Sequence, residues 1–250
     1  MWSLEEEYFF KLKKIAHSRL NPSSVIVYLV GLWLYSLVML GISTWIIKLA
    51  INNGIAVPFV FIIYSCFLVI FLCVFVYLLM CLFWEKILYK TQKVATFLMV
   101  LYTIVMSVEP LFLCRLFALD ESWGKQLDYW IIISVTIALI QFLVCFQLVK
   151  KGILKGSLKK DGTGLFGENK PLKLLIQIMI GSYLLLVFWL FFIIGLSTNI
   201  IGPIIFLALM FLFSIAIQEF IILAICRYRF SSFNVSYEEA TKYRVKKKRR

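Results

Sequence analysis

The sequence predicts an all-α polytopic membrane protein with six transmembrane helices in three hairpins and with both termini in the cytosol. Two observations predict this fold class. First, 62% of the 250 residues are hydrophobic and the mean hydropathy is +0.95, whereas soluble domains are about 45–50% apolar. Second, 26 Lys and Arg residues against 13 Asp and Glu residues give a net charge of +13, and this charge gathers in one set of connections. A soluble domain is therefore excluded.

Six apolar runs are long enough to cross the hydrocarbon layer, which takes roughly 20 residues. They are residues 24–51, 56–83, 94–119, 129–149, 172–196 and 199–226. The runs are continuous and lack the alternation of barrel strands. The first run is also longer than the apolar core of a cleaved signal peptide, about 7–15 residues. The chain therefore divides into an N-terminal segment, a six-helix bundle and a basic tail, which are residues 1–23, 24–226 and 227–250.

The distribution of Lys and Arg predicts the orientation. The N-terminal segment, the second and fourth connections and the tail hold 23 of these residues, and the opposite side holds Lys48, Arg115 and Lys125. Positively charged connections stay in the cytosol, so both termini are expected there. Topology thus accounts for the charge, and nucleic acid is not an expected partner. The expected partner of this charge is the layer of anionic lipid headgroups on the cytosolic side of the membrane.

The segment before the first run predicts an amphipathic helix within residues 1–23. Tyr8, Leu12 and Ile15 form an apolar stripe at helical spacing, and Asn21-Pro22 ends the pattern. Two interpretations follow. The helix rests on the lipid surface, or it docks a cytosolic partner.

The tail predicts a second contact with the membrane. Phe230, Phe233 and Tyr237 recur at helical spacing, which favours an aromatic face turned toward lipid. Five consecutive cations end the chain, and among them Lys247 and Lys248 match a dilysine retrieval signal. The expected location is an integral position in the cell membrane, with the endoplasmic reticulum as the alternative in a eukaryotic host.

Two further patterns concern the connections. Residues 150–171 are rich in Lys and Gly, which predicts a flexible solvated connection. Residues 162–167 match the glycine pattern of a dinucleotide site but lack its strand and helix. Residues 41–47 and 195–201 agree at five of seven positions, so an internal repeat of a hairpin is one hypothesis.

Polar side chains within the apolar runs form the candidate site. A charge in hydrocarbon is costly, so such residues usually face a bundle interior or water. The candidate intramembrane polar residues are Glu109, Arg115, Gln141, Gln218 and Glu219.

Glu109 has three interpretations. It is a proton or cation site beside a helix kinked by Pro110, a buried acid paired with Arg115 or with another span, or a neutral protonated side chain. Glu219 is expected to reach toward water or toward Arg227.

The sequence gives no catalytic constellation, so we expect a protein that is not an enzyme and has no cofactor or metal. His17 is the single histidine, Asp120, Asp128 and Asp161 lie in connections, and the six cysteines fall in apolar runs. The expected function is a permease-like or accessory subunit of a membrane transport system, with a membrane protein or a cytosolic ATPase as partner. The alternative is a membrane scaffold, assembly or immunity protein that packs its helices against another membrane protein.

Overall fold

The computed structural model describes residues 4–55, 58–117, 124–164 and 216–241, and these are helical with no strand among them. Four helices within these described ranges are long and apolar enough to cross a membrane. They are α2 (Pro22–Asn52), α3 (Pro58–Phe83), α5 (Gln92–Phe117) and α6 (Gly124–Leu154). They correspond to the first four predicted runs and fit an integral membrane protein.

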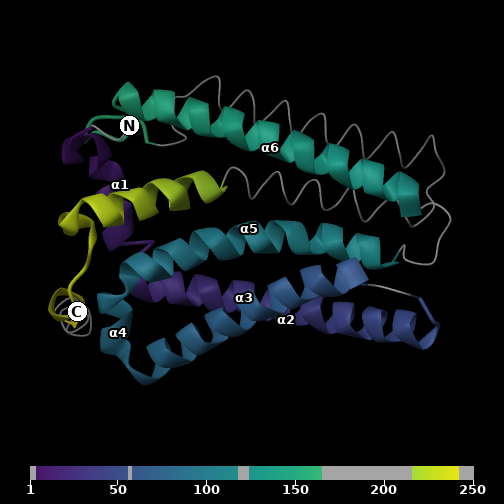
Figure 1. Cartoon of the computed structure of the whole chain (residues 1–250). Coiled ribbons are helices and arrows are strands. Elements are labelled where there is room, and N and C mark those ends of the chain that lie inside the picture. The colour runs from purple at the N-terminus through teal and green to yellow at the C-terminus, as the bar shows by residue number, and fades with distance from the viewer. Residues whose placement is uncertain (1–3, 56–57, 118–123, 165–215, 242–250) are drawn as a thin grey trace, which may run out of the picture.

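The remaining predicted runs fall largely outside the described residues. The run 172–196 lies there entirely, as does the second copy of the suspected repeat, residues 195–201. Of the run 199–226, the structure describes the end, which belongs to a helix over residues 216–229. This helix is drawn in yellow-green between α5 and α6 in Figure 1.

Local chemistry explains where the helices begin and end. The Asn21 side chain accepts a hydrogen bond of 2.9 Å from the Ser24 backbone N–H and caps α2, and Pro22 occupies the first turn. The turn after α2 contains Gly54 with a φ of +75°, a conformation that favours glycine. Helix α6 extends about a turn beyond its predicted run at each end, because flanking polar residues remain helical.

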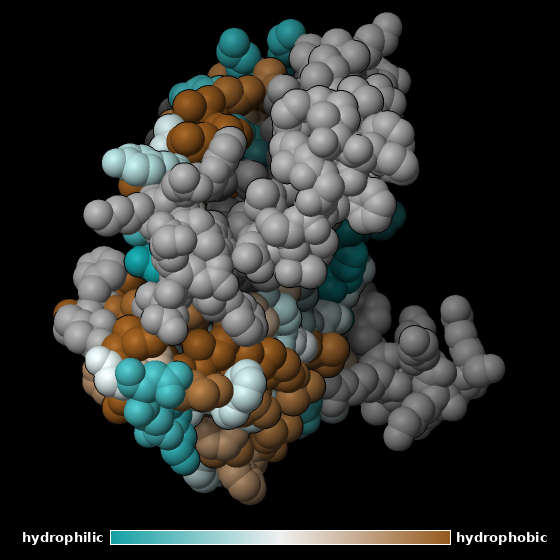
Figure 2. Space-filling view, turned by 90° about the vertical axis from the view of Figure 1, so that its right-hand side faces the viewer, coloured by the Kyte–Doolittle hydropathy of each residue, from teal (hydrophilic) through white to brown (hydrophobic). Residues whose placement is uncertain are grey.

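The helices α2, α3 and α5 pack against one another through aromatic rings. The Trp33 ring of α2 stacks on Phe71 and Phe75 of α3, with centroids 5.0 and 5.2 Å apart. Phe67 of α3 meets Phe112 of α5 edge to face. Other apolar side chains point outward, where lipid would cover them. Figure 2 faces the end of the molecule opposite to residues 4–21, and brown hydrophobic atoms spread over the lower part of its described surface.

Four segments that are far apart in the sequence meet at one end of the bundle, the left end in Figure 1. We call them the terminal cap: residues 4–21, 84–91, 155–164 and 230–241. The second of these contains α4 (Glu85–Lys90). The Lys11 backbone N–H donates to the Leu158 carbonyl at 2.9 Å. The Gln92 side chain donates to the Val235 carbonyl at 3.2 Å and accepts from its N–H at 3.0 Å.

The N-terminal segment packs on protein. It forms a 3₁₀ turn, η1 (Glu6–Phe9), followed by α1 (Phe10–His17). Leu12 is fully buried, and Tyr8 and Ile15 are partly buried against the same core. The predicted apolar stripe is therefore covered by the chain's own cap and bundle end, where we had expected lipid or a separate partner.

The connection after α6 forms hydrogen-bonded turns over residues 155–164 and packs partly on the core, where the sequence predicts a flexible solvated segment. Leu158 is buried in the core. The Lys11 ammonium donates to the Gly162 carbonyl. A side chain at Gly162 would place its Cβ 2.3 Å from the Ser157 carbonyl oxygen, so this tight turn requires glycine.

The described part of the tail also differs from the predicted helix with an aromatic face turned toward lipid. Residues 230–236 do not continue the helix, and a 3₁₀ turn, η2 (Ser231–Phe233), buries Phe233 completely in the core. Phe230 contacts Phe9, and Tyr237 meets Tyr89 edge to face at 5.4 Å. The aromatic side chains thus cover protein, because the N-terminal segment and α4 offer them an apolar surface. Residues 242–250, with the five final cations, lie outside the described residues.

Arg227 joins three elements at the base of the cap. Its side chain has no exposed surface. The guanidinium donates to the Leu20 carbonyl at 2.6 Å and to the Thr96 hydroxyl of α5. It therefore ties helix 216–229 to the N-terminal segment and to α5.

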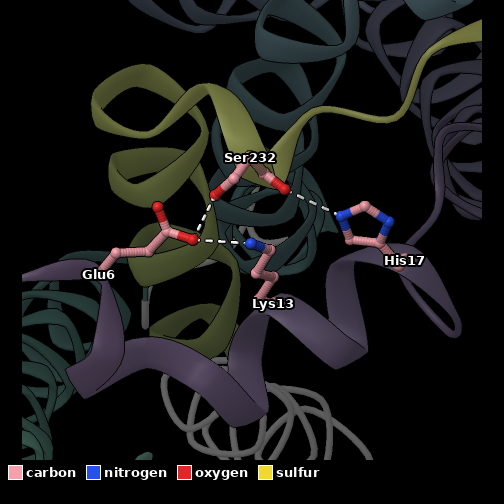
Figure 3. Close-up of polar contacts among 4 residues, drawn as sticks. All are labelled: Glu6, Lys13, His17 and Ser232. Atoms are coloured by element: carbon pink, nitrogen blue, oxygen red, sulfur yellow. Dashed lines mark hydrogen bonds and ion pairs between the residues drawn. The ribbon is translucent and has the colours of Figure 1, made fainter.

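A smaller polar cluster joins α1 to the tail (Figure 3). The Glu6 carboxylate accepts hydrogen bonds from Lys13, with Nζ at 2.7 Å, and from the Ser232 hydroxyl. The His17 Nε2 atom lies 3.0 Å from the Ser232 carbonyl oxygen. The hydrogen bond from Lys13, followed by that from Ser232, lowers the pKa of Glu6 below its ordinary value of 4.5.

The Arg227 contacts predict a specific loss of stability. Arg227→Met should lower the melting temperature of the detergent-solubilised protein, because removing the donor from a buried acceptor costs about 1–3 kcal/mol. Hydrogen exchange should quicken in residues 10–20. Lys90→Met, at an exposed cation that ends α4, is the matched control and should leave both measurements unchanged. Equal melting temperatures of Arg227→Met and the wild type would contradict this role.

The Glu6 cluster predicts a pH dependence of tail docking. Because the folded pKa is lowered, the contribution of the ionised carboxylate is fully present above pH 4.5 and is lost as the pH falls through the folded pKa. At pH 7, Glu6→Gln should increase hydrogen exchange in residues 231–235 relative to the wild type. The two proteins should converge well below pH 4.5. Glu7→Gln, at an exposed neighbour, should match the wild type throughout; a constant difference between Glu6→Gln and the wild type at all pH values would refute the assignment.

Candidate intramembrane polar site

Buried polar side chains line the seam where α5 packs along α2. Ser36 and Ser43 of α2 and Thr103 and Glu109 of α5 are all buried. Most satisfy themselves locally: the hydroxyls of Ser43 and Thr103, for example, donate to carbonyls one turn earlier in their own helices. Glu109 has no such local solution, since a carboxylate cannot donate to a carbonyl. It is therefore the residue of the seam that needs a partner.

Glu109 has a partner for one of its two oxygens. Only 3% of the residue is exposed. Its Oε2 accepts a hydrogen bond of 2.8 Å from the Ser36 hydroxyl of α2. Its Oε1 is buried and has no hydrogen-bond partner in the described part of the chain. A buried acceptor left in this state is costly, so the site can still take up a donor or a cation.

Tyrosine side chains surround the same carboxyl group. The Tyr102 hydroxyl is buried and lies beside that of Ser36. Tyr35 and Tyr102 lie close enough to Glu109 to interact with its charge. The site therefore combines one carboxyl group with hydroxyl groups and aromatic rings between α2 and α5.

Arg115 does not pair with Glu109. Its Nε lies 2.6 Å from Asp128 Oδ1, and this ion pair joins the end of α5 to the start of α6. Helix geometry explains the difference from the prediction: six residues correspond to about 9 Å along the axis and about 120° around it. Arg115 and Glu109 consequently leave α5 in different directions. The structure corrects the hypothesis of an Arg115 partner.

Glu219 pairs with Arg19 of the N-terminal segment and not with Arg227. Its carboxylate is mostly buried, whereas the arginine side chain is largely exposed. The expected partner Arg227 lies eight residues further along and is committed to Leu20 and Thr96. Glu219 thus serves the contact between helix 216–229 and the N-terminal segment.

The two glutamines belong to the α6 side of the molecule. Gln141 of α6 and Gln218 are both buried. The Gln218 amide donates to the Phe142 carbonyl, next to Gln141, at 3.4 Å. The structure therefore separates the five predicted residues into three places: Glu109 at the α2–α5 seam, Arg115 at the far end of α5, and the other three around helix 216–229.

Sequence reasoning missed the partners of Glu109, although a signal for them exists. Ser36 and Ser43 are seven residues apart on α2, and Tyr102 and Glu109 are seven apart on α5. Residues at this spacing share one helix face. Two polar stripes of the same period, on the first and third apolar runs, indicate that these two runs face each other.

The chemistry open to the site is proton or small-cation binding. A single carboxyl group cannot assemble the ligand set of a transition-metal site. The described residues hold no group of three or more His, Cys, Asp or Glu side chains that could bind a metal ion. A carboxyl group with hydroxyl neighbours does suit a proton, or a cation that prefers oxygen ligands.

Comparison with known proteins adds no further assignment. The chain matches no protein-family model, no curated protein and no solved structure.

Proposed function

We propose that the protein is a multi-pass subunit of a membrane transport system, permease-like or accessory, in which Glu109 binds and releases a proton or a small cation. The buried Glu109 carboxyl group carries this proposal, because Ser36 satisfies one oxygen and the other lacks a partner in the described residues. A bare carboxylate in hydrocarbon is costly. A proton or a cation at Oε1 removes that cost, and its exchange would alter the contact between α2 and α5.

The proposed orientation places the terminal cap in the cytosol. The cap segments bring together many of the basic residues, among them Lys11, Lys86 and Lys159. Lys48 and Arg115 belong to the opposite ends of α2 and α5. Retention of positive segments in the cytosol supports this orientation.

The alternative proposal is a scaffold, assembly or immunity protein that acts by packing its helices against another membrane protein. In that case Glu109 serves only the α2–α5 contact. The two proposals differ in whether replacing Glu109 changes ion movement while leaving the fold unchanged.

Replacing Glu109 tests the site. Glu109→Gln keeps the shape and can still accept from Ser36, so the helical content and melting temperature should stay close to those of the wild type. Infrared difference spectra between acidic and alkaline pH should lose the band of one titrating carboxyl group. In proteoliposomes with an imposed membrane potential, the variant should lose any proton or cation flux shown by the wild type.

The matched control is Glu238→Gln, an exposed glutamate of the cap, which should retain the flux and the Glu109 band. An unchanged infrared spectrum in Glu109→Gln would refute the binding site. If the infrared spectrum changes but the wild type shows no flux, the binding site is supported and transport by this chain alone is refuted. Recovery of a stable membrane-protein partner in mild detergent would then favour the scaffold proposal.

Cysteine labelling tests the orientation. In a background without native cysteines, Asn53→Cys at the far end of α2 should react with an impermeant thiol reagent added outside intact cells. Thr163→Cys in the cap should react only after the membrane is permeabilised. Both positions are exposed, so they differ only in the side they face. Labelling of Thr163→Cys from outside would overturn the proposed orientation.

A further inference from the structure

An apolar groove runs along the surface between α5 and helix 216–229. Its volume is about 580 Å³, which lies within the range of small-molecule sites. Phe97 and Val100 form one wall, and Ile221, Ala224 and Ile225 form the other. From Ile221 to the end of the helix the groove extends about 12 Å, at 1.5 Å per residue.

The end of the groove nearest the terminal cap is cationic. Tyr228 and Arg229 close the groove there. The Lys93 ammonium lies 5.7 Å from the centre of the Tyr228 ring, so it stands at the same end. Among the described residues, neither Lys93 nor Arg229 takes part in an ion pair. The groove therefore has an apolar length and, at its mouth, two cations that no carboxylate of the described residues pairs with.

We propose that this groove binds one phospholipid with an anionic headgroup, with the phosphate at Lys93 and Arg229 and one acyl chain along Phe97, Val100 and Ile221. The charge pattern selects this occupant. An apolar partner helix would leave both cations without a counterion, and a soluble anion would leave the apolar walls uncovered. The Tyr228 ring, apolar on its face and polar at its hydroxyl, suits the level between acyl chain and headgroup. The proposal is independent of ion binding at Glu109.

Native mass spectrometry of the full chain tests this proposal. The protein is released from detergent micelles that contain either phosphatidylglycerol or phosphatidylcholine. We expect one retained phosphatidylglycerol per chain and little phosphatidylcholine. Removing each cation, in Lys93→Gln and Arg229→Gln, should weaken retention about fivefold, which corresponds to roughly 1 kcal/mol for a basic residue near an anionic surface.

Two further variants separate a discrete site from general surface attraction. Lys86→Gln removes a cation that lies over Tyr237 and outside the groove, and it should retain phosphatidylglycerol like the wild type. Ala224→Trp fills the groove without changing the charge and should abolish retention. Equal retention of the two lipids would overturn the proposal. The proposal would also be overturned if Lys86→Gln lost as much phosphatidylglycerol as the variant carrying both Lys93→Gln and Arg229→Gln. That result would mean that general surface attraction alone holds the lipid.

Discussion

The buried guanidinium of Arg227 is the constraint on which the cap end of the structure depends. A charged group removed from water needs hydrogen bonds to offset its desolvation. Its two acceptors, the Leu20 carbonyl and the Thr96 hydroxyl, come from elements far away in the sequence. Both can be reached only if the N-terminal segment folds back over the bundle and α5 lies beside helix 216–229. The placement of one side chain thus fixes the relation of three elements.

The terminal cap folds like a small soluble core attached to a membrane bundle. Phe9, Leu12 and Phe233 are buried in one cluster with residues of α2, α5 and α6. Water can drive this burial at the cap, because it removes apolar surface from an aqueous phase. Between helices in lipid that driving force is absent, and close packing and polar contacts take its place. The ring stacking of Trp33 and the Ser36–Glu109 hydrogen bond are contacts of this second kind.

Hydropathy predicted the four described transmembrane helices because length and apolar content are local properties of the chain. The cap escaped prediction because a local pattern does not say what will cover an apolar face. Tyr8, Leu12 and Ile15 would show the same stripe on lipid, on a partner or on the chain itself. In the sequence, Arg227 is one of the 23 basic residues that predict the cytosolic side, because nothing in the sequence distinguishes a buried arginine from a solvated one. Among the site residues, the burial of Glu109 followed from its place in an apolar run, whereas its partner Ser36 depended on the relative rotation of two helices.

That rotation links the cap to the polar seam. Near its start, α5 is held by the Gln92 contact to Val235 and by the Thr96 contact to Arg227. Glu109 lies 13 residues after Thr96, about 20 Å along the same rigid helix. A change of one residue in register would turn every α5 side chain by about 100°, which would take Glu109 away from Ser36 and toward α3 or lipid. Exposing Glu109 to lipid and leaving the Arg227 guanidinium without Thr96 are both costly. Both costs are avoided by the same rotation of α5. The Arg227 contacts in the cap and the Glu109–Ser36 contact in the bundle thus support the same arrangement of the helices, although the side chains of the two sites do not touch.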